Sequence, residues 1–179
     1  EIYSAKIGIK EGAYIESLES PFRHRIGIFG SSFTHGISIS RPGMSYPMQF
    51  MRNTGLQILN LGCGGNCKMQ LYFADVLCDA DVDALIFDSF SNPSAKEIRE
   101  RFNEFVDIIR AAHPEKPLIF MQTERRETRN FSTKIEAFES EKQKAAEEMV
   151  KERMKTDKHI YFIDSEGFLG DEHIATTDG

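Results

Sequence analysis

The sequence is poor in cysteine, the residue that can form disulfide bonds or bind zinc through its thiolate. It has no tryptophan and only three cysteines in 179 residues, Cys63, Cys67 and Cys78. An odd number of thiols excludes a framework in which every cysteine is paired within the chain, and a single Cys63–Cys67 bridge stays open. Three thiols are too few for a four-cysteine zinc site, and no histidine lies at a matching spacing, so we expect no metal site.

Long apolar runs and basic stretches are also lacking. The longest apolar runs, such as ALIF and PLIFM, are far shorter than the roughly 20 residues that a membrane-spanning helix needs. The net charge is −6 and no basic stretch follows a surface, so nucleic acid is not an expected partner. With 40% apolar and 28% charged residues, the chain is typical of one globular domain of ordinary size.

Five segments rich in β-forming residues are spread along the chain. Most are nearly continuous apolar runs, which is typical of strands that are buried on both faces. These segments are RIGIFG (25–30), LQILNLG (56–62), DALIFDS (83–89), KPLIFMQ (116–122) and HIYFID (159–164).

Helical patterns lie between these segments. The clearest begins at Ser94, which forms a capping box with Glu97, and it ends before His113-Pro114. Shorter helices are expected near 46–53 and 68–79.

A second long helix is predicted over about 134–156. Its many lysines and glutamates are interpreted as a solvated face. The apolar residues that share its other face are Ile135, Phe138, Ala145 and Met149.

Strands that alternate with helices predict an α/β fold. We expect a flavodoxin-like three-layer α/β/α sandwich with a five-stranded parallel sheet. In such folds ligands bind beyond the carboxyl ends of the strands. The segments that follow strands are therefore the first candidates for a site: GSSFTHG, GCGGNC, SFSNPS and the tail DSEGFLGDEHIATTDG.

The first of these segments offers a nucleophile. Ser32 stands at the end of the first strand, where a tight turn permitted by Gly30 would expose its hydroxyl. A serine hydroxyl becomes nucleophilic when a base removes its proton. Because paired serines after glycine are common in turns, this segment alone does not separate a nucleophile from an ordinary turn.

The next two segments offer hydrogen-bond donors. Gly64-Gly65 places unhindered backbone N–H groups at the same sheet edge, and Asn92 carries a side-chain amide. Such donors stabilise the charge that builds on a carbonyl oxygen. A structural or phosphate-holding loop is the alternative for the glycines, although no Rossmann or Walker pattern fits. A turn residue before Pro93 is the alternative for Asn92.

The tail offers an acid. Asp178 would orient a histidine, as the acidic member of a catalytic triad does. As an isolated Asp-Gly pair, Asp178-Gly179 is simply a turn signal.

Taken together, these segments resemble the SGNH, or GDSL-like, hydrolase superfamily. That family carries a Gly-Asp-Ser block, a glycine block, an Asn block and a terminal Asp-x-x-His block in this order. The run SRPGMSYPMQFMRNTGLQILNLGCGGN is also similar to a subgroup of bacterial GDSL-like lipase/acylhydrolases. The resemblance spans about residues 25–179. It implies Ser32 as the nucleophile, an oxyanion hole of Ser32, Gly65 and Asn92, and Asp178 as the acid of the triad.

Some positions depart from the family pattern. Ser31 stands where the family usually has Asp, and Phe90 and Pro93 replace the usual Gly and Asp around Asn92. Asp88, four residues before Asn92, fits the subgroup.

The histidine of the triad is expected outside the given sequence. The subgroup's last block typically has the form Asp-Gly-x-His-Pro, and the chain stops at Asp178-Gly179. His35, in the same turn as Ser32, and His173, in the last loop, are the weaker alternatives. The chain also begins without methionine, so we interpret it as a fragment or processed form.

The resemblance also implies a domain organisation. Residues 1–22 are expected to be a lead-in, as the tail of a preceding β-rich domain. Residues 23–179 are expected to be an SGNH hydrolase-like domain that is incomplete at its C-terminus. The expected location is the periplasm or outside of a bacterium, with the cytoplasm left open.

The function implied by the resemblance is that of a serine esterase. It would cleave small acyl esters, chiefly acetyl esters on carbohydrate, without a metal or organic cofactor, and the chain as given would be impaired. Phe33 and Tyr46 either line a sugar site or belong to the core. The alternatives are a non-catalytic glycan-binding module on the same fold and a flavodoxin-like binder of phosphate or flavin.

Overall fold

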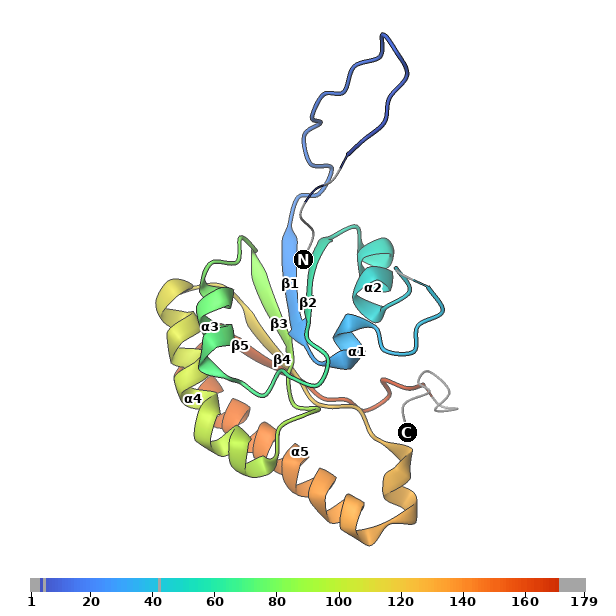
Figure 1. Ribbon diagram of the computed structural model, residues 1–179. Helices are drawn as coiled ribbons and strands as arrows, with labels where there is room; N and C mark the ends of the chain where they lie inside the picture. The colour runs from blue at the N-terminus through green and yellow to red at the C-terminus, as the bar shows by residue number, and fades with distance from the viewer. Residues whose placement is uncertain (1–3, 5, 42, 171–179) are drawn as a thin grey trace.

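A five-stranded parallel sheet forms the centre of the molecule. The computed structural model describes residues 4, 6–41 and 43–170. The strand order is β2-β1-β3-β4-β5, and all neighbouring strands are parallel (Figure 1). The strands are β1 (Arg25–Gly30), β2 (Gln57–Gly62), β3 (Ala84–Asp88), β4 (Leu118–Met121) and β5 (Ile160–Ile163). The predicted α/β fold with this sheet is confirmed.

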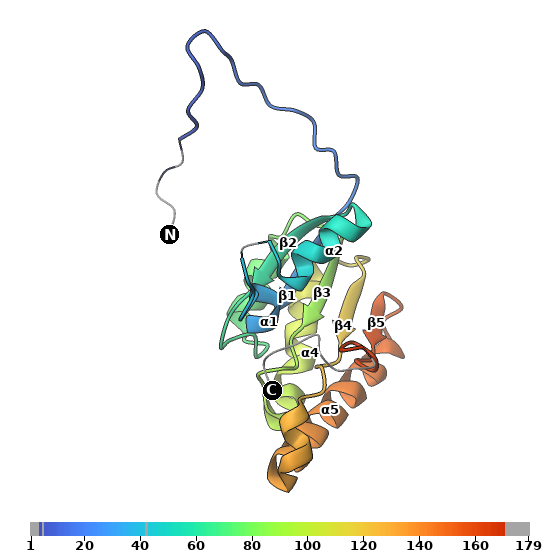
Figure 2. The ribbon, with the colours of Figure 1, turned by 90° about the vertical axis from the view of Figure 1, so that its right-hand side faces the viewer.

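Helices lie on both faces of the sheet. One face is covered by α3 (Leu71–Cys78), α4 (Ala95–Ala112) and α5 (Thr133–Met154), and α2 (Tyr46–Thr54) lies on the other (Figures 1 and 2). The short helix α1 (Ser32–His35) follows β1 directly, and the 3₁₀ helix η1 (Glu127–Phe131) precedes α5.

Helix α4 forms as its sequence predicts. The Ser94 hydroxyl accepts a hydrogen bond from the Glu97 backbone N–H, and the Glu97 carboxylate accepts one from the Ser94 backbone N–H. This reciprocal pair satisfies two donors that would otherwise lack partners at the helix start. The helix ends at His113, as expected. The residues that it buries are Ile98, Phe102, Phe105, Val106 and Ile109.

The core between the sheet and α3–α5 is rich in phenylalanine. The rings of Phe87 and Phe120, on neighbouring strands, stack at 4.5 Å between centroids. Phe102 of α4 packs against Phe120 at 5.1 Å. Each such aromatic pair contributes about 0.5–1.5 kcal/mol beyond the burial of its area. The strands therefore pack against a dense layer of aromatic side chains, and this packing fixes the position of their carboxyl ends.

The prediction that the charged residues of α5 form a solvated face is wrong at two positions. Glu139 and Lys142 are 4% and 1% exposed, whereas Ile135 and Phe138 are 39% and 52% exposed. The amino-terminal half of α5 extends past the ends of the strands (Figure 1). In this half, Lys142 donates to the Ser91 carbonyl oxygen and Glu139 pairs with Arg126 and Lys142, and these polar contacts accompany their burial.

Two parts of the described chain leave apolar side chains exposed. On the face of the sheet that carries α2, Tyr161 and Ile163 of β5 are half-exposed. Residues 6–24 form neither helix nor strand and extend away from the sheet (Figures 1 and 2), and Tyr14 and Leu18 in this segment are largely exposed.

Candidate active site

Three of the predicted site segments begin at adjacent strand ends. Gly30, the last residue of β1, is paired with Gly62 of β2 on one side and with Asp88 of β3 on the other. Because β1 lies between β2 and β3, the segments that follow these strands leave the same edge of the sheet side by side. Ser32, Gly65 and Asn92 belong to these three segments.

Ser31 shapes the turn that presents Ser32. It is the N-cap of α1, it is fully buried, and its hydroxyl accepts a hydrogen bond from the Phe33 backbone N–H at 3.4 Å. Serine and aspartate are among the best N-cap residues. Ser31 can therefore fill the capping position where the related family usually carries Asp. Ser32 is the first residue of the helix and stays partly exposed.

The glycines at the strand ends are needed for space. A Cβ on Gly30 would lie 1.9 Å from Thr34 Oγ1, and a Cβ on Gly62 would lie 2.1 Å from the His35 backbone N. The sequence-based explanation of Gly30 by backbone freedom is therefore replaced by a steric one. The absence of side chains lets α1 lie directly against the ends of β1 and β2.

The glycine-rich loop after β2 touches both other segments. A Cβ on Gly64 would lie 3.9 Å from Ser32 Cβ. Two residues later, the Asn66 carbonyl oxygen accepts a hydrogen bond from Asn92 Nδ2 at 2.7 Å. Gly65, between them, has φ +71°, in the left-handed region that favours glycine. The loop thus connects the turn of Ser32 to the turn of Asn92.

Two backbone donors of the predicted oxyanion hole are unused. Within the part of the chain that the structure describes, the N–H groups of Ser32 and Gly65 donate no hydrogen bond. For Ser32 this follows from its place at the start of a helix, where N–H groups have no partner within the helix. Asp178 and His173 lie outside the described residues.

A buried polar network lies behind α1. The Asp88 carboxylate, 4% exposed, accepts hydrogen bonds from Thr34 Oγ1 at 2.8 Å and from the Tyr46 hydroxyl at 3.0 Å. Burial raises the pKa of the Asp88 carboxyl, and the two hydrogen bonds oppose that rise. Burial and the Asp88 charge also raise the pKa of the Tyr46 hydroxyl, which keeps it protonated as a donor. The network ties α1 and α2 to β3.

Glu124, which follows β4, is a second buried acid at this edge. Burial and the neighbouring charge of Asp88 raise the pKa of its carboxyl to about 7. Its Oε1 atom and the Thr123 hydroxyl are buried without a hydrogen-bond partner in the described structure. No sequence signal distinguished Glu124 from the charged residues around it.

A cluster of charges next to Asn92 was also missed. Arg126 donates to the Ser91 hydroxyl at 2.9 Å, and Lys142 donates to the Ser91 carbonyl oxygen at 3.0 Å. Glu139 pairs with both cations. The Arg126 guanidinium also lies 5.9 Å from the centre of the Phe33 ring. Arg126 comes from the loop after β4, and Glu139 and Lys142 are the buried charged residues of α5.

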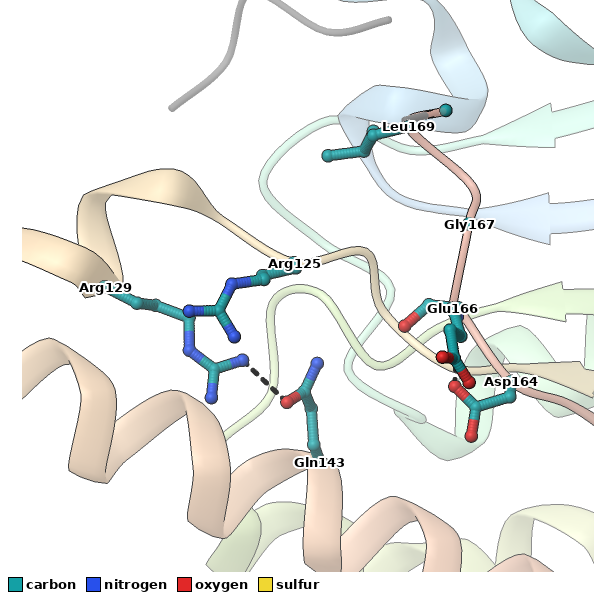
Figure 3. Close-up of a pocket in the computed structure, with 9 residues that line it drawn as sticks. Arg125, Arg129, Gln143, Asp164, Glu166, Gly167 and Leu169 are labelled. Atoms are coloured by element: carbon teal, nitrogen blue, oxygen red, sulfur yellow. Dashed lines mark hydrogen bonds between the residues drawn. The ribbon is translucent and has the colours of Figure 1, made fainter. Parts of the chain in front are cut away.

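A cavity of about 390 Å³ lies beyond the carboxyl ends of β4 and β5. Arg125, Arg129 and Gln143 line one side of it, and Asp164 and Glu166 line the other (Figure 3). The Arg129 guanidinium is already engaged, donating to the Glu136 carboxylate, Ser140 and Gln143. The wall is therefore polar and largely fixed by its own hydrogen bonds.

The cysteines and acids form no metal centre in the described part of the chain. Cys63, Cys67 and Cys78 are free thiols, so the Cys63–Cys67 bridge that the sequence left open is not formed. No group of three His, Cys, Asp or Glu side chains there is arranged to hold a metal ion. The described chain also contains no helix that is long and apolar enough to cross a membrane.

Comparison with known proteins places the chain in a family. The model of the GDSL-like lipase/acylhydrolase family matches residues 23–179, and the chain belongs to this family. It is 42% identical to a structure named as a GDSL-like lipase from Bacteroides ovatus, with a TM-score of 0.86, over 96% of this chain and 51% of that one. The chain thus spans about half the length of that relative. Among curated proteins, none matches.

More distant structures share the fold. AlinE4, an SGNH-hydrolase family esterase, has a TM-score of 0.63 at 16% identity, over 91% of this chain and 86% of that one. A family two carbohydrate esterase from Cellvibrio japonicus has a TM-score of 0.58 at 14% identity, over 79% and 52%. The resemblance to SGNH hydrolases deduced from the sequence is confirmed.

Proposed function

We propose that the protein is a serine esterase whose nucleophile is Ser32. The observation that carries the proposal is the meeting of three segments at one sheet edge. The glycine-rich loop approaches Ser32 at Gly64 and accepts a hydrogen bond from Asn92 at Asn66. Membership of the GDSL-like lipase/acylhydrolase family supports the same chemistry.

The reaction is acyl transfer to water. The Ser32 hydroxyl attacks the ester carbonyl, and its proton passes to the histidine expected beyond Gly179, which Asp178 would orient. The alcohol leaves with that proton. Water then attacks the acyl-enzyme, the histidine takes a proton from the water, and Ser32 leaves with that proton. A serine, histidine and acid suffice for acyl transfer by this route, so we propose that no metal or organic cofactor takes part.

The tetrahedral intermediate carries a negative oxygen that needs donors. The N–H groups of Ser32 and Gly65 have no other partner in the described structure, and the Asn92 amide supplies a third donor. Asn92 uses one amide hydrogen on Asn66 and keeps the other. Removal of one oxyanion donor typically lowers turnover by about 10²–10³-fold.

For the substrate, we propose small acyl esters, chiefly acetyl esters, carried on carbohydrate. The polar cavity beyond β4 and β5, with Arg125 on one side and Asp164 on the other, suits an alcohol component rich in hydroxyl groups (Figure 3). The fold shared with a carbohydrate esterase supports the same assignment. We place such an enzyme in the periplasm or outside a bacterial cell.

The test uses the full-length protein with p-nitrophenyl acetate and a fluorophosphonate probe. Ser32→Ala is expected to abolish both hydrolysis and labelling, and Asn92→Ala to lower kcat by about 10²–10³-fold. Ser17→Ala, in the exposed amino-terminal segment, serves as the control and should leave both unchanged. Labelling or hydrolysis that persists in Ser32→Ala would refute the proposal.

A further inference from the structure

We propose that Arg126, Glu139 and Lys142 are positioning residues that hold the Ser91-Asn92 turn, so that the Asn92 amide points at the reacting carbonyl. The proposal rests on the esterase function above. It adds residues that act through Asn92 and do not touch the substrate.

The carbonyl oxygen and the hydroxyl of Ser91 both accept hydrogen bonds from cations. Lys142 Nζ donates to its carbonyl oxygen at 3.0 Å, and Arg126 Nη2 donates to its hydroxyl at 2.9 Å. Ser91 itself is 3% exposed. The Ser91 carbonyl belongs to the peptide group that joins Ser91 to Asn92. The hydrogen bond from Lys142 therefore constrains the orientation of Asn92 directly.

Glu139 joins the two cations. Its Oε2 lies 2.6 Å from Lys142 Nζ, and its Oε1 lies 3.5 Å from Arg126 Nη1. The Glu139 and Lys142 side chains are 5% and 1% exposed. Buried ion pairs of this kind are weak contributors to stability, because desolvation of the charges offsets their attraction. Packing alone would be served as well by apolar side chains, so the charges point to a requirement for defined geometry.

Arg126 also reaches the turn of the nucleophile. Its guanidinium lies 5.9 Å from the centre of the Phe33 ring, and Phe33 follows Ser32. The same side chain thus contacts the residue before Asn92 and the residue after Ser32. With the Asn92–Asn66 hydrogen bond, this arrangement links the nucleophile, the glycine loop and the amide donor into one unit.

The geometry of an oxyanion donor is demanding. Donors act at about 2.7–3.1 Å from the oxygen, and a displacement of about 1 Å can lower the rate by about 10²-fold. Without the contacts of Arg126 and Lys142, the turn would still carry the Asn92 amide, but the amide would no longer be held in the orientation that the oxyanion needs.

The principal test is the double variant Glu139→Gln/Lys142→Met in the full-length protein. It removes the buried charges together, so that neither is left unpaired, and it leaves Arg126 an amide oxygen to bind. We expect kcat for p-nitrophenyl acetate to fall by about 10–10²-fold while KM stays unchanged. A raised KM with unchanged kcat would overturn the proposal, because it would indicate direct contact with substrate.

A double-mutant cycle with Asn92→Ala separates positioning from a general structural role. If the cluster acts through Asn92, adding Glu139→Gln/Lys142→Met to Asn92→Ala costs little further activity. Additive losses would overturn the proposal. Arg126→Lys keeps a cation and is expected to retain more kcat than Arg126→Gln; equal losses would argue against the role of Arg126.

Two further measurements serve as a control variant and as a separate test of the esterase function. Arg99→Met breaks the exposed ion pairs of Arg99 in α4 with Glu141 and Glu148 of α5 without touching Ser91, and should leave kcat unchanged. If Ser32→Ala retains the parent's hydrolysis, the esterase function fails. If Ser32→Ala abolishes hydrolysis but the cycle is additive, only the positioning role fails.

Discussion

Glu124 makes the stability of the protein depend on pH in a defined direction. Its carboxyl has an ordinary pKa of 4.5 and a folded-state pKa of about 7, because it is buried near the charge of Asp88. Between these values the folded protein binds more protons than the unfolded chain. The stability that this group contributes is present below pH 4.5 and is lost as the pH rises toward 7, so the free energy of unfolding falls over this range.

The magnitude follows from the two pKa values. Their full difference corresponds to about 3 kcal/mol, of which about 2.5 kcal/mol is lost between pH 5 and pH 8. Glu124→Gln keeps the shape of the side chain but removes its titration. We therefore expect the variant to gain about 2–3 kcal/mol relative to the parent at pH 8, and to differ much less at pH 5.

The assay is urea unfolding followed by far-UV circular dichroism, because the chain has no tryptophan to serve as a fluorescent probe. Measurement of both proteins across pH 5–8 cancels the contribution of groups that do not interact with Glu124. Glu115→Gln, at an exposed glutamate before β4, is the matched control and should follow the parent curve. A parent and a Glu124→Gln variant with parallel curves would refute the reasoning.

Two further predictions concern the turn that presents the nucleophile. Ser31→Ala removes the N-cap of α1 and should lower the free energy of unfolding by about 0.5–2 kcal/mol in urea titrations, while fluorophosphonate labelling persists; unchanged stability would show that the cap contributes nothing. Gly62→Ala places a Cβ about 2.1 Å from the His35 backbone N and should cost at least about 1–3 kcal/mol. Gly8→Ala, with open space around it, should cost nothing in comparison, and equal losses would contradict the steric argument.

Sequence patterns predict those parts of the fold that local signals control. The capping box at Ser94 and the stop at His113 sufficed to place α4, because both act within a few residues. The strands were found because parallel strands buried on both faces are nearly continuous apolar runs. The sequence also predicted that the segments of Ser32, Gly65 and Asn92 lie close together, because the carboxyl ends of parallel strands meet at one edge of the sheet.

The charged residues of the site could not be found in the same way. In α5, Glu139 and Lys142 have the same composition and spacing as the exposed charges around them. What buries them is the extension of the helix beyond the strands, which depends on tertiary structure. Glu124 and Arg126 lie in a run of charges after β4 that has the appearance of a solvated loop. The N-cap role of Ser31 was missed as well, because no pattern in the sequence predicted the four-residue helix α1.

The contact between α1 and the bare ends of β1 and β2 has a consequence for how this protein can diversify. At Gly62 the backbone of α1 lies directly against the strand, and at Gly30 the Thr34 side chain fills the space, so the position of Ser32 is tied to the sheet. The cavity wall, by contrast, is built from the loop after β4, η1, α5 and the segment after β5, all outside that contact. Libraries that vary Arg125, Asp164 and Glu166 should therefore change substrate preference while the reactivity of the serine toward a small fluorophosphonate stays constant.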